Sequence, residues 1–237
     1  MPKIRLHYFG HSTFALESEN LETKDKQAII IDPFITGNPH MQGRSLPKGL
    51  VFSHILLTHG HSDHSGDAES LAKLHGATVV ASFELANLLA AKGVKTFPCA
   101  PGGKLEFPWG WVRLVPAMHS SSFAGHYAGA SVGLVINMGG VSIYHSGDTG
   151  LFSDMELIGK RYNLDLALLP IGGTFTMDVE EAVEAVKMLK PKEVVPMHFN
   201  TFPVIQADPQ RFSSLVEEKT GKKVQVMAAG DVYECGD

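Results

Sequence analysis

The pattern of hydrophobic and polar residues along the chain predicts a protein rich in short β-strands. Apolar or alternating segments recur between glycine, proline and aspartate residues, and such segments are typical of strands. We expect strands at residues 3–8, 12–17, 28–32, 54–58, 77–81, 111–116, 131–137, 141–145, 165–169, 193–197 and 223–228.

Helical spacing of apolar residues is rarer but clear where it occurs. Residues 178–190 begin with Asp178 and Glu181 as a capping-box pair and end before a proline. Residues 209–220 follow Asp208 as a helix N-cap, and Gly221 ends that helix. Two further helices are expected at residues 65–75 and 84–92.

The order of these elements repeats once along the chain. Residues of about 1–100 and 101–237 each read as a ββ unit followed by a βαβ unit, although coincidence could produce the same likeness. Two such copies predict an α/β (α+β) protein in which two sheets pack face to face with helices outside. We expect a single domain over residues 1–237.

Composition narrows the possible functions. The chain has 237 residues, of which 44% are hydrophobic and 19% charged, so it can fill one large core. A net charge of −5 without a basic cluster gives no strong signal for nucleic acid. The N-terminal segment lacks the features of a signal peptide, no apolar run is long enough to span a membrane, and Cys99 and Cys235 show no metal-ligand spacing. We therefore expect a cytoplasmic protein with reduced thiols.

The most informative segment is the run from His59 to His64, His-Gly-His-Ser-Asp-His, which follows an apolar strand. Imidazoles and carboxylates bind first-row metal ions. In extended backbone, His59 and His61 point to one side and can share an ion. Asp63 and His64 are adjacent and cannot both join that pair easily, which suggests a second ion. A histidine-rich surface loop or a fragment of an affinity tag is the alternative, but tags occur at termini.

Three further candidate ligands follow predicted strands, as His59 does. His119 comes after the strand at 111–116, Asp148 after 141–145 and His198 after 193–197. If these strand ends share one edge of the sandwich, four loops converge on one site.

With these residues in this order, the chain resembles the metallo-β-lactamase superfamily over essentially its whole length. Further stretches resemble its UPF0173 group of metal-dependent hydrolases, which is related to the ascorbate-6-phosphate lactonase branch. These stretches are Gly10-His11-Ser12, Ile31-Asp32-Pro33, residues 170–177 and residues 197–203. The resemblance implies the metallo-β-lactamase fold, a four-layer αββα sandwich of two mixed β-sheets flanked by helices.

The resemblance also implies a dinuclear metal site. One ion would be held by His59, His61 and His119, and the other by Asp63, His64 and His198, with Asp148 bridging them. Zn²⁺ suits these ligands best, and Mn²⁺, Ni²⁺ and Fe²⁺ suit them too.

The expected function is hydrolysis of a small ester, lactone or phosphodiester. Two metal ions lower the pKa of a shared water toward about 7, and the resulting metal-bound hydroxide attacks the substrate. Asp63 and Asp148 are the expected catalytic carboxylates, with Asp63 orienting the water and Asp148 bridging the ions.

Other residues are expected around these ligands. Asp32 could hold the outer nitrogen of a ligand histidine, or simply begin a turn before Pro33. His11 and His145 are expected near the site without binding metal. Asn200 and Thr176 offer uncharged donors to a polar substrate, and the loops at 120–130 and 199–206 are the expected substrate-contacting segments.

Two other classes of protein fit part of the pattern. A di-iron oxidoreductase could use the same fold, but no flavin- or rubredoxin-like segment is present. A noncatalytic metal-binding module would not require all of the expected ligands. The expected partner is a small-molecule substrate, without membrane association, and a homo-oligomer is possible.

Overall fold

Two seven-stranded β-sheets form the centre of the molecule in the computed structural model, which describes residues 4–19 and 26–236. The first sheet has the strand order β16-β1-β2-β3-β4-β5-β6 and the second β15-β14-β13-β12-β11-β8-β7. The first comprises β1 (Ile4–Tyr8), β2 (Phe14–Glu19), β3 (Lys26–Ile31), β4 (Phe52–Leu56), β5 (Thr78–Ser82), β6 (Thr96–Cys99) and β16 (Val232–Cys235). The second comprises β7 (Lys104–Phe107), β8 (Gly110–Pro116), β11 (Val132–Met138), β12 (Val141–His145), β13 (Leu166–Pro170), β14 (Glu193–Met197) and β15 (Lys223–Val224).

Both sheets are mixed in the same manner. In the first, β1, β2 and β3 pair antiparallel, and β3 to β6 continue in parallel. In the second, β8, β11 and β12 pair antiparallel, and β12 to β15 continue in parallel. A separate hairpin consists of β9 (Ser122–Phe123) and β10 (His126–Tyr127).

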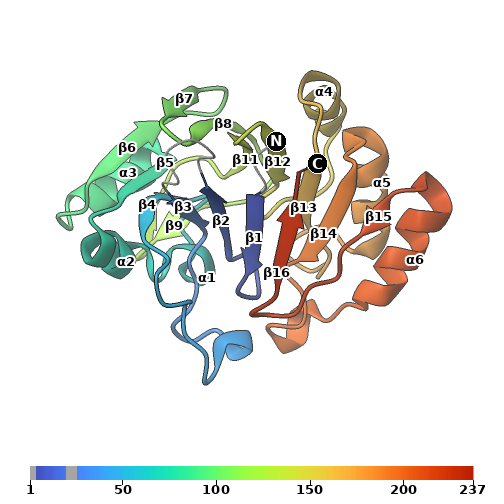
Figure 1. Ribbon diagram of the computed structural model, residues 1–237, viewed down its shortest axis with the longest axis horizontal. Helices are drawn as coiled ribbons and strands as arrows, with labels where there is room; N and C mark the ends of the chain where they lie inside the picture. The colour runs from blue at the N-terminus through green and yellow to red at the C-terminus, as the bar shows by residue number, and fades with distance from the viewer. Residues whose placement is uncertain (1–3, 20–25, 237) are drawn as a thin grey trace.

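Helices cover the outer face of each sheet, which gives the four layers αββα (Figure 1). Buried side chains such as Ile29, Leu134 and Leu168 form the core between the sheets. The outer face of the first sheet packs on α2 (Ala68–His75) and α3 (Phe83–Ala90), and that of the second on α4 (Met155–Arg161), α5 (Val179–Leu189) and α6 (Pro209–Thr220). No helix among the described residues is long and apolar enough to cross a membrane.

The predicted helix at 65–75 is divided in the structure. It consists of α1 (Ser62–Ser65) and α2, and Asp67 precedes the second of these as its N-cap residue. The Asp67 carboxylate accepts hydrogen bonds from the backbone N–H groups of Ile35 and Thr36 and from the Thr36 hydroxyl, at 2.7 to 2.9 Å. Asp67 thus fastens a neighbouring loop at the point where the prediction had a continuous helix.

The other differences between the predicted and the observed elements occur where the hydrophobic pattern of the sequence is weak. The predicted strand at 223–228 is ordered as a strand only over Lys223–Val224. The pattern did not predict β6, β7, β9, β10, β16 or α4, nor the 3-10 turns η1 (Pro39–Met41) and η2 (Pro203–Ile205). Several of these strands are short or lie at sheet edges, where a buried face leaves little trace in the sequence.

Candidate metal centre

The expected ligands lie beyond the ends of strands from both sheets, in loops and, for Asp63 and His64, in the short helix α1. His59 follows β4, while His119, Asp148 and His198 follow β8, β12 and β14. His11 lies in the turn between β1 and β2. The turn and the start of α1 lie together at the lower edge of the sandwich in Figure 1. Tertiary folding therefore brings together residues from distant parts of the chain.

Three of the histidines form a first group. His59, His61 and His119 each offer a ring nitrogen, and these nitrogens lie within 4.8 Å of one another. The Nε2 atom of His59 is 3.0 Å from Nδ1 of His61. The two side chains thus meet as the two-residue spacing predicted.

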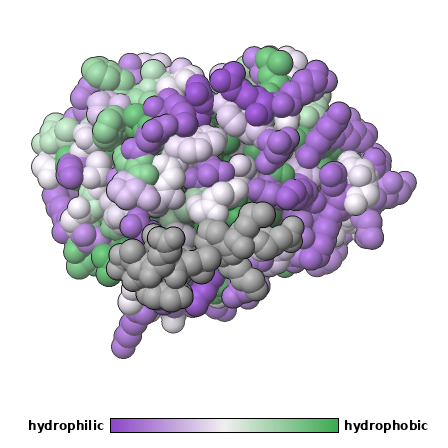
Figure 2. Space-filling model, turned by 45° about the horizontal axis from the view of Figure 1, so that its top comes forward, coloured by the Kyte–Doolittle hydropathy of each residue, from purple (hydrophilic) through white to green (hydrophobic). Residues whose placement is uncertain are grey.

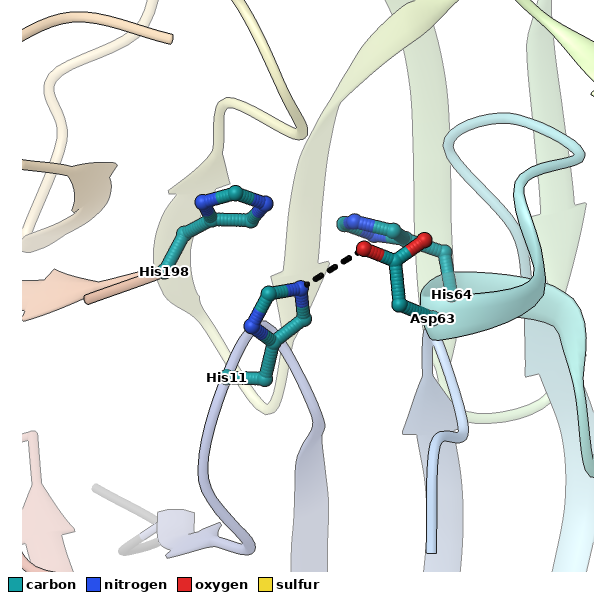
Figure 3. Close-up of side chains that lie close together, drawn as sticks. All are labelled: His11, Asp63, His64 and His198. Carbon is teal, nitrogen blue, oxygen red and sulfur yellow. Dashed lines mark hydrogen bonds and ion pairs between the residues drawn. The ribbon is translucent and has the colours of Figure 1, made fainter. Parts of the chain in front are cut away.

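A second group contains His11, Asp63, His64 and His198, whose ligand atoms also lie within 4.8 Å of one another. Figure 3 shows these side chains converging, with Asp63 and His64 on helix α1 and His11 and His198 on separate turns. His64 and His198 are buried, whereas the Asp63 side chain is 29% exposed and reaches the adjoining pocket.

Asp148 lies between the two groups. Its Oδ1 atom is 3.3 Å from Nε2 of His64, and its Oδ2 atom is 3.0 Å from Nε2 of His198 and 3.7 Å from Nε2 of His119. Each carboxylate oxygen therefore approaches ring nitrogens, and both groups of histidines are within its reach.

Asp32 holds His64 from the side away from Asp148. Its Oδ2 atom accepts a hydrogen bond from Nδ1–H of His64 at 2.8 Å. The same carboxylate accepts bonds from the backbone N–H and the hydroxyl of Thr58, at 2.8 and 2.6 Å. Asp32 also lies within 4.8 Å of His59 and His64 as a possible third group, but its oxygens are already engaged by these bonds. Its geometry is that of a carboxylate that orients a histidine.

Thr58 gives His59 a defined orientation as well. The Thr58 hydroxyl donates its only hydrogen to Asp32, so it accepts a bond from Nδ1–H of His59, 3.0 Å away. This arrangement leaves the lone pair of His59 Nε2 directed at the first group. Sequence reasoning did not identify Thr58, although a hydroxyl residue immediately before the histidine run was a usable signal.

His11 is hydrogen-bonded at both ring nitrogens. Nε2 lies 3.2 Å from Oδ2 of Asp63, and Nδ1 lies 2.9 Å from the Thr201 hydroxyl. A carboxylate can only accept, so Nε2 carries the hydrogen and Thr201 donates to Nδ1. Burial is the main cause that lowers the pKa of His11 to about 4. His11 is therefore a neutral donor that positions Asp63.

The charges at the centre are strongly coupled. Burial acts to lower the pKa of His64, but Asp148 and Asp32 outweigh it and raise that pKa well above its ordinary value. Burial acts to raise the pKa of the Asp148 carboxyl, but His198 and His64 hold it well below. Burial itself lowers the pKa values of His59 and His119. The centre thus contains an ionised carboxylate facing imidazoles, two of which burial favours as neutral.

The donor atoms fit a metal ion. Among the described residues, His64 Nε2, Asp148 Oδ1 and both ring nitrogens of His198 are buried without a hydrogen-bond partner. The contacts of Asp148 with His64 and His198 are short enough for ion pairs but lack hydrogen-bond geometry. Because Nδ1 of His64 carries a hydrogen, neutral His64 would turn a lone pair toward a carboxylate, and a cation between them removes that repulsion.

The backbone at the centre is unusual. Asp32, His11 and His198 have positive φ angles of 45°, 57° and 53°, a region that costs energy for residues other than glycine. The backbone N–H of His198 donates to the carbonyl of His11 at 2.8 Å, so the two turns support each other. Such strained conformations persist only where the surrounding structure holds the residues in place, as the hydrogen bond between these two turns does here.

His145, one of the residues expected near the site, is buried and hydrogen-bonded at both ring nitrogens. Nε2–H of His145 donates to the carbonyl of Ser12 at 3.0 Å, and Nδ1 accepts from the N–H of Gly147 at 3.1 Å. Both ring nitrogens are engaged, so His145 supports the loop before Asp148. Asn200 and Thr176, which were expected to contact a polar substrate, lie outside the set of residues that line the adjoining pocket, and their contact with substrate stays a prediction.

Asn200 and Thr176 do not line the pocket beside the histidines. Asn200 has a φ of 58°, and its side chain accepts a hydrogen bond from the backbone N–H of Ala207. It lines a different cavity instead, beside His40 and Arg44. The Thr176 side chain is buried and its hydroxyl donates to the carbonyl of Met177. Local sequence showed the right donor types but not the directions in which they point.

A pocket of about 510 Å³ opens beside the two groups. Residues 120–130 contribute Ser120 to its lining, whereas residues 199–206 contribute several side chains. The described residues that line it are His61, Asp63, His119, Ser120, Asp148, Phe175, His198, Phe202, Val204 and Ile205. Sequence reasoning did not identify the apolar members of this set, because their contact with the histidines depends on the tertiary fold.

Comparison with known families and proteins identifies the superfamily. The family model of the Beta-lactamase superfamily domain matches residues 27–199. A UPF0173 metal-dependent hydrolase of Desulforamulus reducens is 45% identical over 233 residues, covering 96% of this chain and 98% of the relative. A UPF0173 metal-dependent hydrolase of Thermus thermophilus is 46% identical over 231 residues, covering 97% and 98%.

Solved structures share the same fold. Igni18, a metallo hydrolase from the archaeon Ignicoccus hospitalis, aligns with a TM-score of 0.89 and 38% identity over 99% of each chain. CmlA, a diiron β-hydroxylase from Streptomyces venezuelae, aligns with a TM-score of 0.71 over 99% of this chain and 54% of its own. Its identity is 14%, so this second likeness concerns the fold alone.

Proposed function

Because this chain belongs to the metallo-β-lactamase superfamily, and within it to the UPF0173 metal-dependent hydrolases, we propose that it hydrolyses a small ester, lactone or phosphodiester at a dinuclear metal centre. His59, His61 and His119 would hold one divalent ion, and Asp63, His64 and His198 the other. Asp148 would bridge the two. Zn²⁺ is the proposed metal because nitrogen and carboxylate oxygen ligands suit it.

One observation carries the proposal. Buried, unpartnered donor atoms of His64, His198 and Asp148 face one another beside a pocket that opens to solvent. A purely structural cluster would leave such atoms hydrogen-bonded, because an unsatisfied buried polar atom costs about 1–3 kcal/mol. Their position at a pocket favours a reaction centre over a structural metal site.

The chemistry requires both the metal and the surrounding side chains. Two divalent ions, when bound by these ligands, would supply a hydroxide at neutral pH and would stabilise negative charge on the substrate. Asp63 is held by His11, and its exposed part reaches the pocket, where it can orient a water or accept a proton. Asp32 and Thr58 keep His64 and His59 in the tautomers that direct a lone pair at the centre.

Replacement of Asp148 tests this proposal. We expect Asp148→Ala to lower metal occupancy and to abolish hydrolysis, since the two histidine groups lose the carboxylate between them. Metal content is measured by elemental analysis, and turnover with phosphodiesters, lactones and β-lactams. Asp165→Ala is the control, because it changes a carboxylate just before β13, at the end of that strand away from the candidate metal ligands. This variant should retain both metal content and turnover. An Asp148→Ala protein with two bound ions and an undiminished rate would contradict the bridging role, and redox turnover with iron but no hydrolysis would contradict the hydrolase.

A further inference from the structure

One wall of the pocket beside the metal centre is apolar. It consists of Phe175, Phe202, Val204 and Ile205, and we refer to these four residues as the apolar wall. Phe175 and Val204 are each 58% exposed. Single exposed apolar side chains also occur elsewhere on the surface, but here two of them adjoin two further apolar residues at the edge of a polar pocket. A grouped apolar surface of this kind fits contact with another molecule.

The apolar wall is held in place by one hydrogen bond between its two segments and one within the second segment. The Thr174 hydroxyl donates to the carbonyl of Val204 at 2.7 Å, which ties the loop of Phe175 to that of Val204. The carbonyl of Ile205 accepts from the N–H of Asn200 at 2.8 Å. The Phe202 ring lies with its centroid 5.6 Å from that of His11. A surface fixed in this way can bind a ligand without the cost of ordering loops.

The same pocket offers no cationic side chain. Among its described lining residues there is no lysine or arginine, and the charged groups are those of the metal centre itself. A carboxylate or phosphate distant from the reacting bond would therefore have no counter-ion. On the face displayed in Figure 2, by contrast, the surface is predominantly hydrophilic and hydrophobic residues are scattered. The non-reacting part of a matching substrate is consequently apolar and uncharged.

We infer that the substrate is a neutral ester or lactone whose alkyl chain packs on the apolar wall. This inference rests on the proposed hydrolase function and narrows its substrate class. Water adds to the carbonyl carbon, the carbon–oxygen bond to the leaving oxygen breaks, and that oxygen takes a proton. An ester yields a carboxylic acid and an alcohol, and a lactone yields a hydroxy acid. Contact of the alkyl chain with the apolar wall contributes binding energy in the transition state, and this contribution raises kcat/KM.

A series of p-nitrophenyl esters with one leaving group and acyl chains from acetate to hexanoate tests the inference in the metal-loaded protein. We expect kcat/KM to rise about two- to fourfold per added methylene. The upper factor corresponds to full burial of the methylene group against the wall, and the lower factor to partial burial. A series that is flat with chain length would overturn the inference. Turnover of bis(p-nitrophenyl) phosphate without turnover of any ester or lactone would also overturn it, and would leave the hydrolase proposal standing.

A charge in the apolar wall provides the matched test. Val204→Lys should flatten the dependence on chain length and improve turnover of a p-nitrophenyl monoester of glutaric acid, whose free carboxylate can pair with the lysine. Val51→Lys is the control, because Val51 is 65% exposed just before β4, at the other end of the strand from His59. It should behave like the unmodified protein. An unchanged chain-length dependence in Val204→Lys would contradict the role of the wall.

Measuring the affinity of inhibitors tests the apolar wall independently of the proposed hydrolase function, because it requires no turnover. Alkyl hydroxamates of increasing chain length chelate divalent ions and extend an alkyl tail, and calorimetry measures their affinity without turnover. We expect affinity to rise with chain length in the unmodified protein and in Val51→Lys, but not in Val204→Lys. Affinity independent of chain length would overturn the apolar wall. If every hydrolysis assay fails, the hydrolase proposal is wrong, and these affinities still decide whether the wall binds alkyl chains.

Discussion

Individual hydrogen bonds determine which nitrogen of each histidine faces the metal centre. Asp32 accepts from Nδ1 of His64, and Thr58 accepts from Nδ1 of His59. Both histidines consequently direct Nε2 inward. His11 differs from them, because both of its nitrogens are engaged by Asp63 and Thr201. Chemically identical side chains thus serve as candidate ligands or as supports, depending on the neighbours of their outer nitrogens.

Asp32→Asn tests this role of an outer hydrogen bond. The substitution keeps the size of the side chain but removes the negative charge next to His64. We expect metal affinity to fall about 10–100-fold, as is usual when such a partner of a ligand histidine is changed. Competition with a chelator measures the affinity. Asp165→Asn serves as the matched control, and equal affinities for the two variants would show that Asp32 only shapes its turn.

At the scale of elements, the ends of strands place the site. The strands β8, β12 and β14 run in the same direction in the second sheet, so the residues that follow them, His119, Asp148 and His198, lie at one edge. His59, which follows β4 in the first sheet, meets them there. The loop after β13 also approaches this edge closely. A Cβ atom on Gly172 would lie 2.3 Å from the carbonyl oxygen of His198. The close approach leaves no room for a side chain.

Gly172→Ala should therefore displace the turn that carries His198. The blocking atom belongs to the backbone and cannot rotate away, so we expect a loss of about 1–3 kcal/mol in the free energy of unfolding together with weaker metal binding. Chemical denaturation and metal titration measure the two effects. In Gly150→Ala, an added Cβ meets nothing within 4 Å, and this variant should match the unmodified protein. Normal metal binding by Gly172→Ala would mean that the His198 turn is not rigidly placed.

At the scale of the whole molecule, burial of histidines makes the metal-free protein sensitive to acid. The pKa of His11 is lowered from 6.5 to about 4, and burial also lowers the pKa values of His59 and His145. As the pH falls below 6.5, the unfolded chain takes up protons that the folded protein does not. His64 acts in the opposite sense, since its raised pKa gives stability that is present below pH 6.5 and lost as the pH rises through the raised value.

We expect the lowered histidines to outweigh His64, because they are more numerous. The free energy of unfolding of the chelator-treated protein should fall as the pH drops from 6.5 toward 4, with each such histidine contributing at most about 1.4 kcal/mol per pH unit. Urea denaturation at pH 7.5, 6 and 5 measures this dependence. Equal or greater stability at pH 5 would contradict it. Metal-loaded protein should be more stable at neutral pH and should lose that advantage on acidification, as protons compete for the ligands.

Local patterns in the sequence predicted much of the architecture. Alternation and apolar runs indicated strands such as β12 and β14 with their exact bounds, and Asp178 and Asp208 marked the starts of α5 and α6. These signals depend on burial of one face or on bonds between near neighbours, which a sequence records directly. Edge strands such as β7 and the break at Asp67 depend on contacts with distant segments, and they were not predicted.

The sequence by itself determined which side chains are candidate metal ligands, because the types and spacing of residues from His59 to His64 are those of a metal site. Only the tertiary structure decided how that chemistry is arranged. It brought His11 and Asp32 against those ligands, directed Asn200 and Thr176 elsewhere, and placed the apolar wall opposite the histidines. The physical reason is that coordination chemistry belongs to the side chains, whereas their directions depend on backbone turns and packing between segments far apart in the chain.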